Sequence, residues 1–130
     1  MNLVQELNIS KELAIKAGEA IMKIYEDSFD IEYKEDESPI TLADKTANEI
    51  IVDKLKEEFP AYAILSEECE DDLSRLDNDF CWIVDPLDGT KEFIKKNGEF
   101  TVNIALSYKS RVVLGVIYLP VTKELYYAAK

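Results

Sequence analysis

The stretch WIVDPLDGTKEFI, residues 82–94, raises the main structural question about this chain. In it an apolar run ends in two aspartates, Asp85 and Asp88, and a glycine and a threonine follow at once. Asp-Pro and Asp-Gly are common turn formers, so one interpretation is an acidic turn at the end of a strand. The alternative interpretation is a place where a metal ion and a phosphate group meet.

Asp85 and Asp88 suit a magnesium site. Mg²⁺ prefers oxygen ligands in octahedral geometry and keeps several waters, so a protein usually supplies only a few carboxylates. Pro86 fixes its own φ angle and is expected to turn the chain as it leaves the strand. The two carboxylates can then converge on one ion, with the carbonyl group of Leu87 between them.

The residues after Asp88 suit a phosphate group. Gly89 allows a ligand to approach the backbone closely. Thr90 stands where a short helix over residues 90–98 is expected to begin, so its hydroxyl and the free N–H groups are available to an anion. Metal and phosphate could therefore be held side by side.

Two further places offer carboxylates. A predicted strand at residues 62–65 ends in Ser66-Glu67-Glu68, and strand ends often carry ligands in open α/β proteins. Upstream, Thr41-Leu-Ala-Asp44 begins a predicted helix and fits a capping box, with Thr41 as the N-cap. The functional alternative for Asp44 is an acidic group that, with Thr90, orients and deprotonates a water held by the metal.

The spacing of apolar residues predicts an α+β fold, with two long helices packed on a mainly antiparallel sheet. The first helix has apolar residues three and four apart: Leu13, Ala17, Ala20, Ile21 and Ile24. The second continues this spacing: Ala43, Ala47, Ile51, Leu55 and Phe59. Five short runs rich in β-branched and aromatic residues follow, and short turns join the last ones as a meander.

Charge and composition narrow the classes of function. The chain has 130 residues and a net charge of −12, with no basic stripe for a nucleic-acid polymer. A bound cation can reverse the local charge, so a phosphate ester remains acceptable. The sequence predicts one domain over residues 1–130, in the cytoplasm, with no membrane association and two reduced cysteines, Cys69 and Cys81. Its last strand stops abruptly, which favours self-association through an unfinished sheet edge.

Several segments together resemble the inositol-monophosphatase-like family of magnesium-dependent, lithium-sensitive phosphatases. They are SPITLADKTANEII (38–51), LSEE (65–68), WIVDPLDGTKEFIKKNGEFTVNIAL (82–106) and LGVIYLPV (114–121). The continuation Lys91-Glu92-Phe93 looks most like the CysQ branch, the 3′(2′),5′-bisphosphate nucleotidases. The resemblance implies the N-terminal domain of the inositol monophosphatase and sugar phosphatase fold.

The resemblance also implies a role for each matching residue. Glu67, Asp85, Asp88 and the carbonyl of Leu87 would hold Mg²⁺, and Glu68 would contribute from behind them. Asp44 and Thr90 would activate the attacking water, while the N–H groups of Gly89 and Thr90 would receive the phosphate. The reaction implied is hydrolysis of 3′-phosphoadenosine 5′-phosphate to AMP, a step associated with sulfate assimilation.

The resemblance leaves three readings open. Family members continue into a C-terminal domain that carries a further metal ligand and the substrate's walls, and none of it is in these 130 residues. We therefore expect weak or absent turnover by this chain alone. The alternatives to the nucleotidase are an inositol monophosphatase and a non-catalytic metal-binding or interaction domain.

Overall fold

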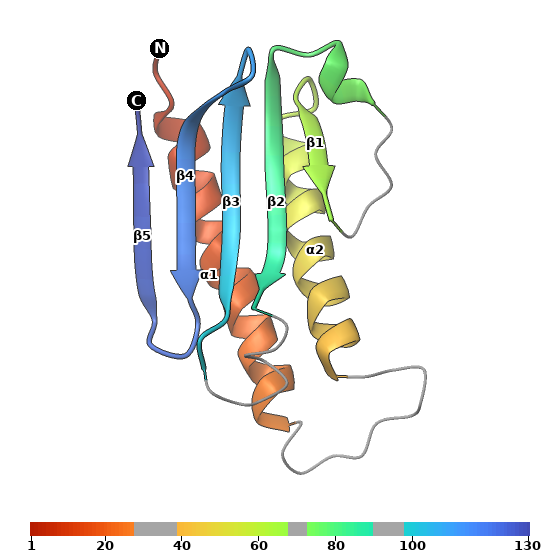
Figure 1. Ribbon diagram of the computed structural model, residues 1–130, viewed down its shortest axis with the longest axis vertical. Helices are drawn as coiled ribbons and strands as arrows, with labels where there is room; N and C mark the ends of the chain where they lie inside the picture. Colours follow the sequence, from red (N-terminus) through yellow and green to blue (C-terminus); the bar gives the residue numbers. More distant parts are fainter. Residues whose placement is uncertain (28–38, 68–72, 90–97) are drawn as a thin grey trace.

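The computed structural model describes residues 1–27, 39–67, 73–89 and 98–130. Two long helices pack on one face of a five-stranded sheet (Figure 1), so the expected α+β fold is confirmed. The elements are α1 (Val4–Asp27), α2 (Pro39–Glu58), β1 (Ala63–Ser66), the 3₁₀ helix η1 (Ser74–Leu76), β2 (Phe80–Asp88), β3 (Thr101–Tyr108), β4 (Arg111–Leu119) and β5 (Glu124–Ala129).

The sheet is mixed but mainly antiparallel. Its order is β1-β2-β3-β4-β5, with β1 parallel to β2 and every later neighbour antiparallel. The predicted meander of β2 to β5 is therefore confirmed. At the β3–β4 hairpin Lys109 and Ser110 both have positive φ, 47° and 68°, the conformation that matches the twist of paired strands.

The core lies between the helices and one face of the sheet. Apolar residues at helical spacing face the sheet, where alternate strand residues meet them. The helical members that are fully buried are Ala14, Ala17, Ile21, Ala43, Ala47, Ile51 and Leu55. The largest buried strand residues are Trp82, Val84, Val102, Ile104, Leu106, Leu114 and Val116. This alternation fixes which face of each strand is left for function.

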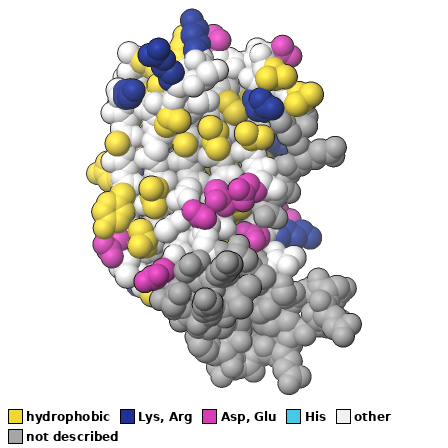
Figure 2. Space-filling view, viewed as in Figure 1, with side chains coloured by type: hydrophobic (Ala, Val, Ile, Leu, Met, Phe, Trp, Pro, Cys, Tyr) yellow, Lys and Arg dark blue, Asp and Glu magenta, His cyan; other side chains and the backbone are white. Residues whose placement is uncertain are grey.

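The opposite face of the sheet is covered by neither α1 nor α2, and the 3₁₀ helix η1 borders it beside the start of β2 (Figure 1). Figure 2 shows this open face, with apolar side chains spread over it and acidic side chains gathered in its lower half. The exposed apolar residues on it include Ile83 in β2, Ile117 in β4 and Tyr126 in β5. Within the described residues, neither helix is both long and apolar enough to cross a membrane.

The start of α2 corrects one prediction. The helix begins at Pro39, so Thr41 is a residue of the first turn and its assignment as N-cap is wrong. Proline is favoured at the first helical position because the N–H that it lacks would have no helical partner there. The predicted short helix over residues 90–98 falls almost wholly outside the described residues.

Candidate metal and phosphate site

Strand β2 contains a bulge between the two aspartates of the DPLD segment. Asp85 lies opposite Asn103 and Asp88 lies opposite Thr101, so three steps along β2 match two steps along β3. Pro86 has no N–H for the ladder, which makes this the place where an extra residue disturbs pairing least. The expected turn is therefore wrong for residues 85–88, because the strand continues through them to Asp88.

The bulge places both carboxylates on one face of the sheet. Residues directly opposite each other in a ladder project to the same face, and Asn103 and Thr101 are two residues apart, so they share a face too. Without the extra residue, Asp88 would project into the core. Instead it is exposed on the open face, where Asp85 is half-buried. Asn103 Nδ2 donates a hydrogen bond to Asp88 Oδ2 at 3.1 Å.

Glu67 follows the end of β1, next to this pair. The parallel register matches Ser66 with Val84, and Glu67 and Asp85 are the residues that follow this last matched pair. Ser66 and Val84 are both buried, which directs the following residue of each strand away from the core. Glu67 is exposed accordingly. Three carboxylates, Glu67, Asp85 and Asp88, thus meet the open face at the ends of two neighbouring strands.

A buried polar pair ties α2 to this end of the sheet. Ser66 Oγ donates a hydrogen bond to Asn48 Oδ1 at 2.6 Å, and both residues are buried. Asp44 lies one helical turn before Asn48, at i−4, and is half-buried. Strands β1 and β2 run toward the end at which α2 begins (Figure 1), so Asp44 belongs to the same end of the molecule.

The remaining predicted residues are placed only in part. Glu68 and Thr90 lie outside the described residues. Gly89 follows β2 with φ of 96°, a left-handed conformation that glycine adopts without strain. The side chain of Leu87 is buried, as suits a residue offered for its backbone carbonyl alone.

These residues do not form a closed metal cage. Among the residues that the structure describes, no group of three or more His, Cys, Asp or Glu side chains is close enough to hold an ion. The donor set fits Mg²⁺ nevertheless, because that ion takes a few carboxylates and fills its other positions with water. Carboxylates on an open strand end leave room for those waters.

Sequence reasoning missed two residues, Asn48 and Asn103. Asn48 interrupts the apolar spacing of α2, and Asn103 stands in the middle of the alternating strand TVNIALSY, where asparagine is disfavoured. An amide at such a position is a usable signal, but its partner depends on register. Neither partner, Ser66 or Asp88, could be read from the sequence alone.

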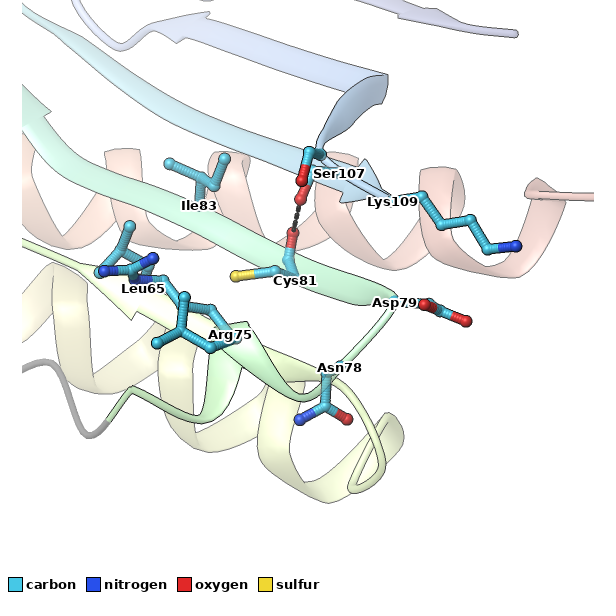
Figure 3. Close-up of a pocket in the computed structure, with 10 residues that line it drawn as sticks. Leu65, Arg75, Asn78, Asp79, Cys81, Ile83, Ser107 and Lys109 are labelled. Carbon is cyan, nitrogen blue, oxygen red and sulfur yellow. Dashed lines mark hydrogen bonds between the residues drawn. The ribbon is translucent and has the colours of Figure 1, made fainter.

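A separate hollow lies further along the open face, toward the start of β2 (Figure 3). It encloses about 430 Å³ and is lined by Leu65, Arg75, Leu76, Asn78, Asp79, Cys81, Ile83, Ser107, Lys109 and Ser110. Ser107 Oγ donates a hydrogen bond to the carbonyl of Cys81 at 3.2 Å, while the side chain of Lys109 points away from the hollow. None of the residues predicted for the metal or phosphate lines it, so it is distinct from the carboxylate site.

Comparison with known proteins identifies the family of this chain. The model of the inositol monophosphatase family matches residues 2–130. The chain belongs to the inositol monophosphatase family. The 3′(2′),5′-bisphosphate nucleotidase CysQ of Salmonella typhimurium is 50% identical over 122 residues, which are 92% of this chain and 50% of that protein. The Nus factor SuhB of Escherichia coli is 38% identical over 126 residues, 95% of this chain and 47% of that protein.

The family fold is confirmed by solved structures. The crystal structure of CysQ from Bacteroides thetaiotaomicron, described as a bacterial member of the inositol monophosphatase family, superposes with a TM-score of 0.89 at 52% identity. The match covers 99% of this chain and 48% of that one. The chain thus spans about half the length of the curated relatives and solved structures that it matches.

Proposed function

We propose that this chain is the N-terminal, magnesium-binding domain of a phosphomonoesterase of the 3′(2′),5′-bisphosphate nucleotidase type. The observation that carries the proposal is the bulge in β2, because it sets Asp85 and Asp88 on one face with Glu67 beside them. The similarity to proteins named CysQ, at 50% and 52% identity, supports 3′-phosphoadenosine 5′-phosphate as the substrate.

The oxygen ligands divide between side chains and backbone. Glu67, Asp85, Asp88 and the carbonyl of Leu87 hold Mg²⁺ in this proposal, and Glu68 acts from behind them. Magnesium supplies positive charge that stabilises the phosphoryl oxygens during in-line displacement. Asp85 is half-buried and Asp88 is exposed, and Asn103 Nδ2 donates a hydrogen bond to Asp88 Oδ2.

The remaining residues handle the water and the phosphate. Asp44, on the α2 turn that Asn48 fixes to β1, orients the attacking water and takes its proton together with Thr90. The N–H groups of Gly89 and Thr90 receive the phosphate, and the left-handed conformation of Gly89 suits such an approach. The ester bond breaks as water oxygen bonds to phosphorus, which yields AMP and inorganic phosphate.

The proposal extends to the cellular compartment and to self-association. Cys81 is buried and forms no disulfide, which agrees with a reducing cytoplasm. Strand β5 is the last strand of the sheet and carries the exposed Tyr126 and Tyr127, so self-association through its outer edge is the partner interaction we propose. An interaction domain without catalysis, and an inositol monophosphatase, are the rival functions that the test must separate.

The test is phosphate release from 3′-phosphoadenosine 5′-phosphate and from inositol 1-phosphate, with Mg²⁺. The wild type is compared with Asp85→Asn and with Asp53→Asn, which removes an exposed α2 carboxylate elsewhere. We expect slow release from the nucleotide that Asp85→Asn abolishes and Asp53→Asn preserves. Preference for inositol 1-phosphate would overturn the substrate assignment, and release unaffected by Asp85→Asn would overturn the site. Absence of any release would contradict catalysis by this domain alone.

A further inference from the structure

The open face next to the carboxylates holds one amide whose place in the sheet is unusual. Asn103 sits opposite Asp85 in the ladder and donates from Nδ2 to Asp88 Oδ2, so it touches the site from the neighbouring strand. Every other residue of β3 on this face is small: Thr101, Ala105 and Ser107. A central strand rarely carries asparagine, since its side chain adds little packing there.

The carbonyl end of this amide lacks a partner. Asn103 Oδ1 is buried and accepts no hydrogen bond from the residues that the structure describes. The orientation of the amide follows from Asp88, because a flipped amide would set two acceptor oxygens 3.1 Å apart. A buried acceptor without a donor is rare and costly, and such exceptions call for a functional explanation.

The charges around Asn103 indicate what the missing donor is. Its oxygen lies among acceptors, with the carboxylate of Asp85 across the ladder and that of Asp88 at the other end of the amide. A hydrated cation would neutralise the carboxylates and supply the donor for Asn103 Oδ1, because the waters bound to a cation are strong hydrogen-bond donors. Mg²⁺ keeps several waters when it binds to carboxylates.

We propose that Asn103 is a positioning residue of the metal site. Its Nδ2 holds Asp88 on the open face, and its buried Oδ1 accepts a hydrogen bond from a water of hydrated Mg²⁺. The inference rests on the proposed function, since it takes Asp85 and Asp88 as the magnesium ligands. In this proposal Asn103 does not bind the ion itself and acts on it only through Asp88 and a bound water.

The proposal predicts opposite effects on stability and on metal binding. Asn103→Thr suits a strand and removes the unpaired carbonyl, so the magnesium-free chain should unfold at the same temperature or higher. The same variant should bind Mg²⁺ about 10–100-fold more weakly, the range found when groups behind metal ligands are removed. A purely structural asparagine would instead give lower stability and unchanged affinity.

The experiment is calorimetric titration of the full 130-residue chain with MgCl₂, together with thermal unfolding in EDTA. Ser107→Ala is the matched control, because it changes the same face of the same strand without touching Asp88. Weaker binding in Asn103→Thr and in Asn103→Ala, with Ser107→Ala unchanged, supports the proposal. Equal affinity in wild type and Asn103→Thr overturns it and leaves the carboxylate site standing. A wild type that binds no Mg²⁺ overturns both.

Discussion

At the scale of single residues, two buried or half-buried polar contacts hold elements in place around the core. The Ser66–Asn48 bond joins β1 to α2, and Tyr62 Oη donates a hydrogen bond to Glu6 Oε2 at 2.9 Å, which joins the start of β1 to α1. Neither contact belongs to the site chemistry. Each hydrogen bond positions a helix against the strand ends, so its loss should lower the free energy of unfolding.

Ser66→Ala should destabilise the chain. The variant removes the hydroxyl donor from a fully buried pair and leaves Asn48 Oδ1 without it, which costs about 1–3 kcal/mol. Urea unfolding followed by circular dichroism measures the change. Ser107→Ala, which removes a half-buried hydroxyl at the other end of the sheet, should cost less. An equal loss of free energy of unfolding in both variants would show that the Ser66–Asn48 bond contributes no more to stability than the bond made by Ser107.

Tyr62 should make stability fall at high pH. Burial, and then the hydrogen bond to Glu6, raise the pKa of Tyr62 from its ordinary value of 10.0 to about 12. The folded chain therefore keeps the phenolic proton between pH 10 and 12 while the unfolded chain loses it. The contribution of Tyr62 to the free energy of unfolding is therefore complete below pH 10 and is lost as the pH rises through 12.

Comparison of three chains checks this pH dependence. The free energy of unfolding of the wild type should fall between pH 10 and 12, and Tyr62→Phe should lack that part of the fall. Glu6→Gln should lower the pKa of Tyr62, because the carboxylate acceptor is gone. The same slope in wild type and Tyr62→Phe would contradict the assignment.

At the scale of elements, the packing of α1 on the sheet depends on a close approach between a glycine of α1 and a ring of β4. The ring of Tyr118 in β4 packs directly on Gly18 of α1, where a Cβ atom would lie 2.6 Å from Tyr118 Cδ2. Gly115, three residues earlier in β4, differs because a Cβ there would meet no atom within 4 Å. Only the first glycine is required by the packing of α1 on the sheet.

The two glycines predict contrasting alanine variants. Gly18→Ala should lower the free energy of unfolding by about 1–3 kcal/mol through overpacking, a loss that outweighs the gain of up to about 1 kcal/mol in helix propensity. Gly115→Ala should leave stability unchanged or raise it by about 0.5–1 kcal/mol, because alanine loses less backbone entropy. Chemical denaturation of both variants checks the contrast, and a reversed order would show that α1 is free to shift away from β4.

The elements and the meander of the last strands were largely predictable from the sequence, but the register between the strands was not. Apolar spacing of three and four predicted both helices, and β-branched runs predicted all five strands, because burial on one face dictates those patterns. The bulge at Pro86 and the bond from Asn103 to Asp88 depend on register with β3, which is set by packing far away in sequence. The site residues were therefore recognisable by type, while the way they reach one face was visible only in three dimensions.

At the scale of the whole molecule, the sheet has two edge strands, β1 and β5, and β5 carries exposed tyrosines. The chain carries a net charge of −12, which keeps copies apart at low salt. Exposed Tyr126 and Tyr127 on an edge strand favour association of two copies. The balance between the two should depend on salt, because screening weakens only the repulsion.

Self-association should therefore respond to salt and to a charge on β5. Sedimentation velocity of the wild type should show more dimer at high NaCl concentration than at low. Tyr126→Lys, which places a charge on the edge strand, should suppress the dimer, whereas Asp53→Asn on α2 should not. A monomer at every salt concentration would refute association through β5.

Calorimetric titration of the wild type, Asp85→Asn and Asp53→Asn measures whether the carboxylates at the ends of β1 and β2 bind Mg²⁺. We predict saturable binding by the wild type and by Asp53→Asn, and affinity at least about 10-fold weaker in Asp85→Asn, since a carboxylate ligand becomes a neutral amide. Equal affinities in all three chains, or no binding by the wild type, would contradict Mg²⁺ binding by these carboxylates.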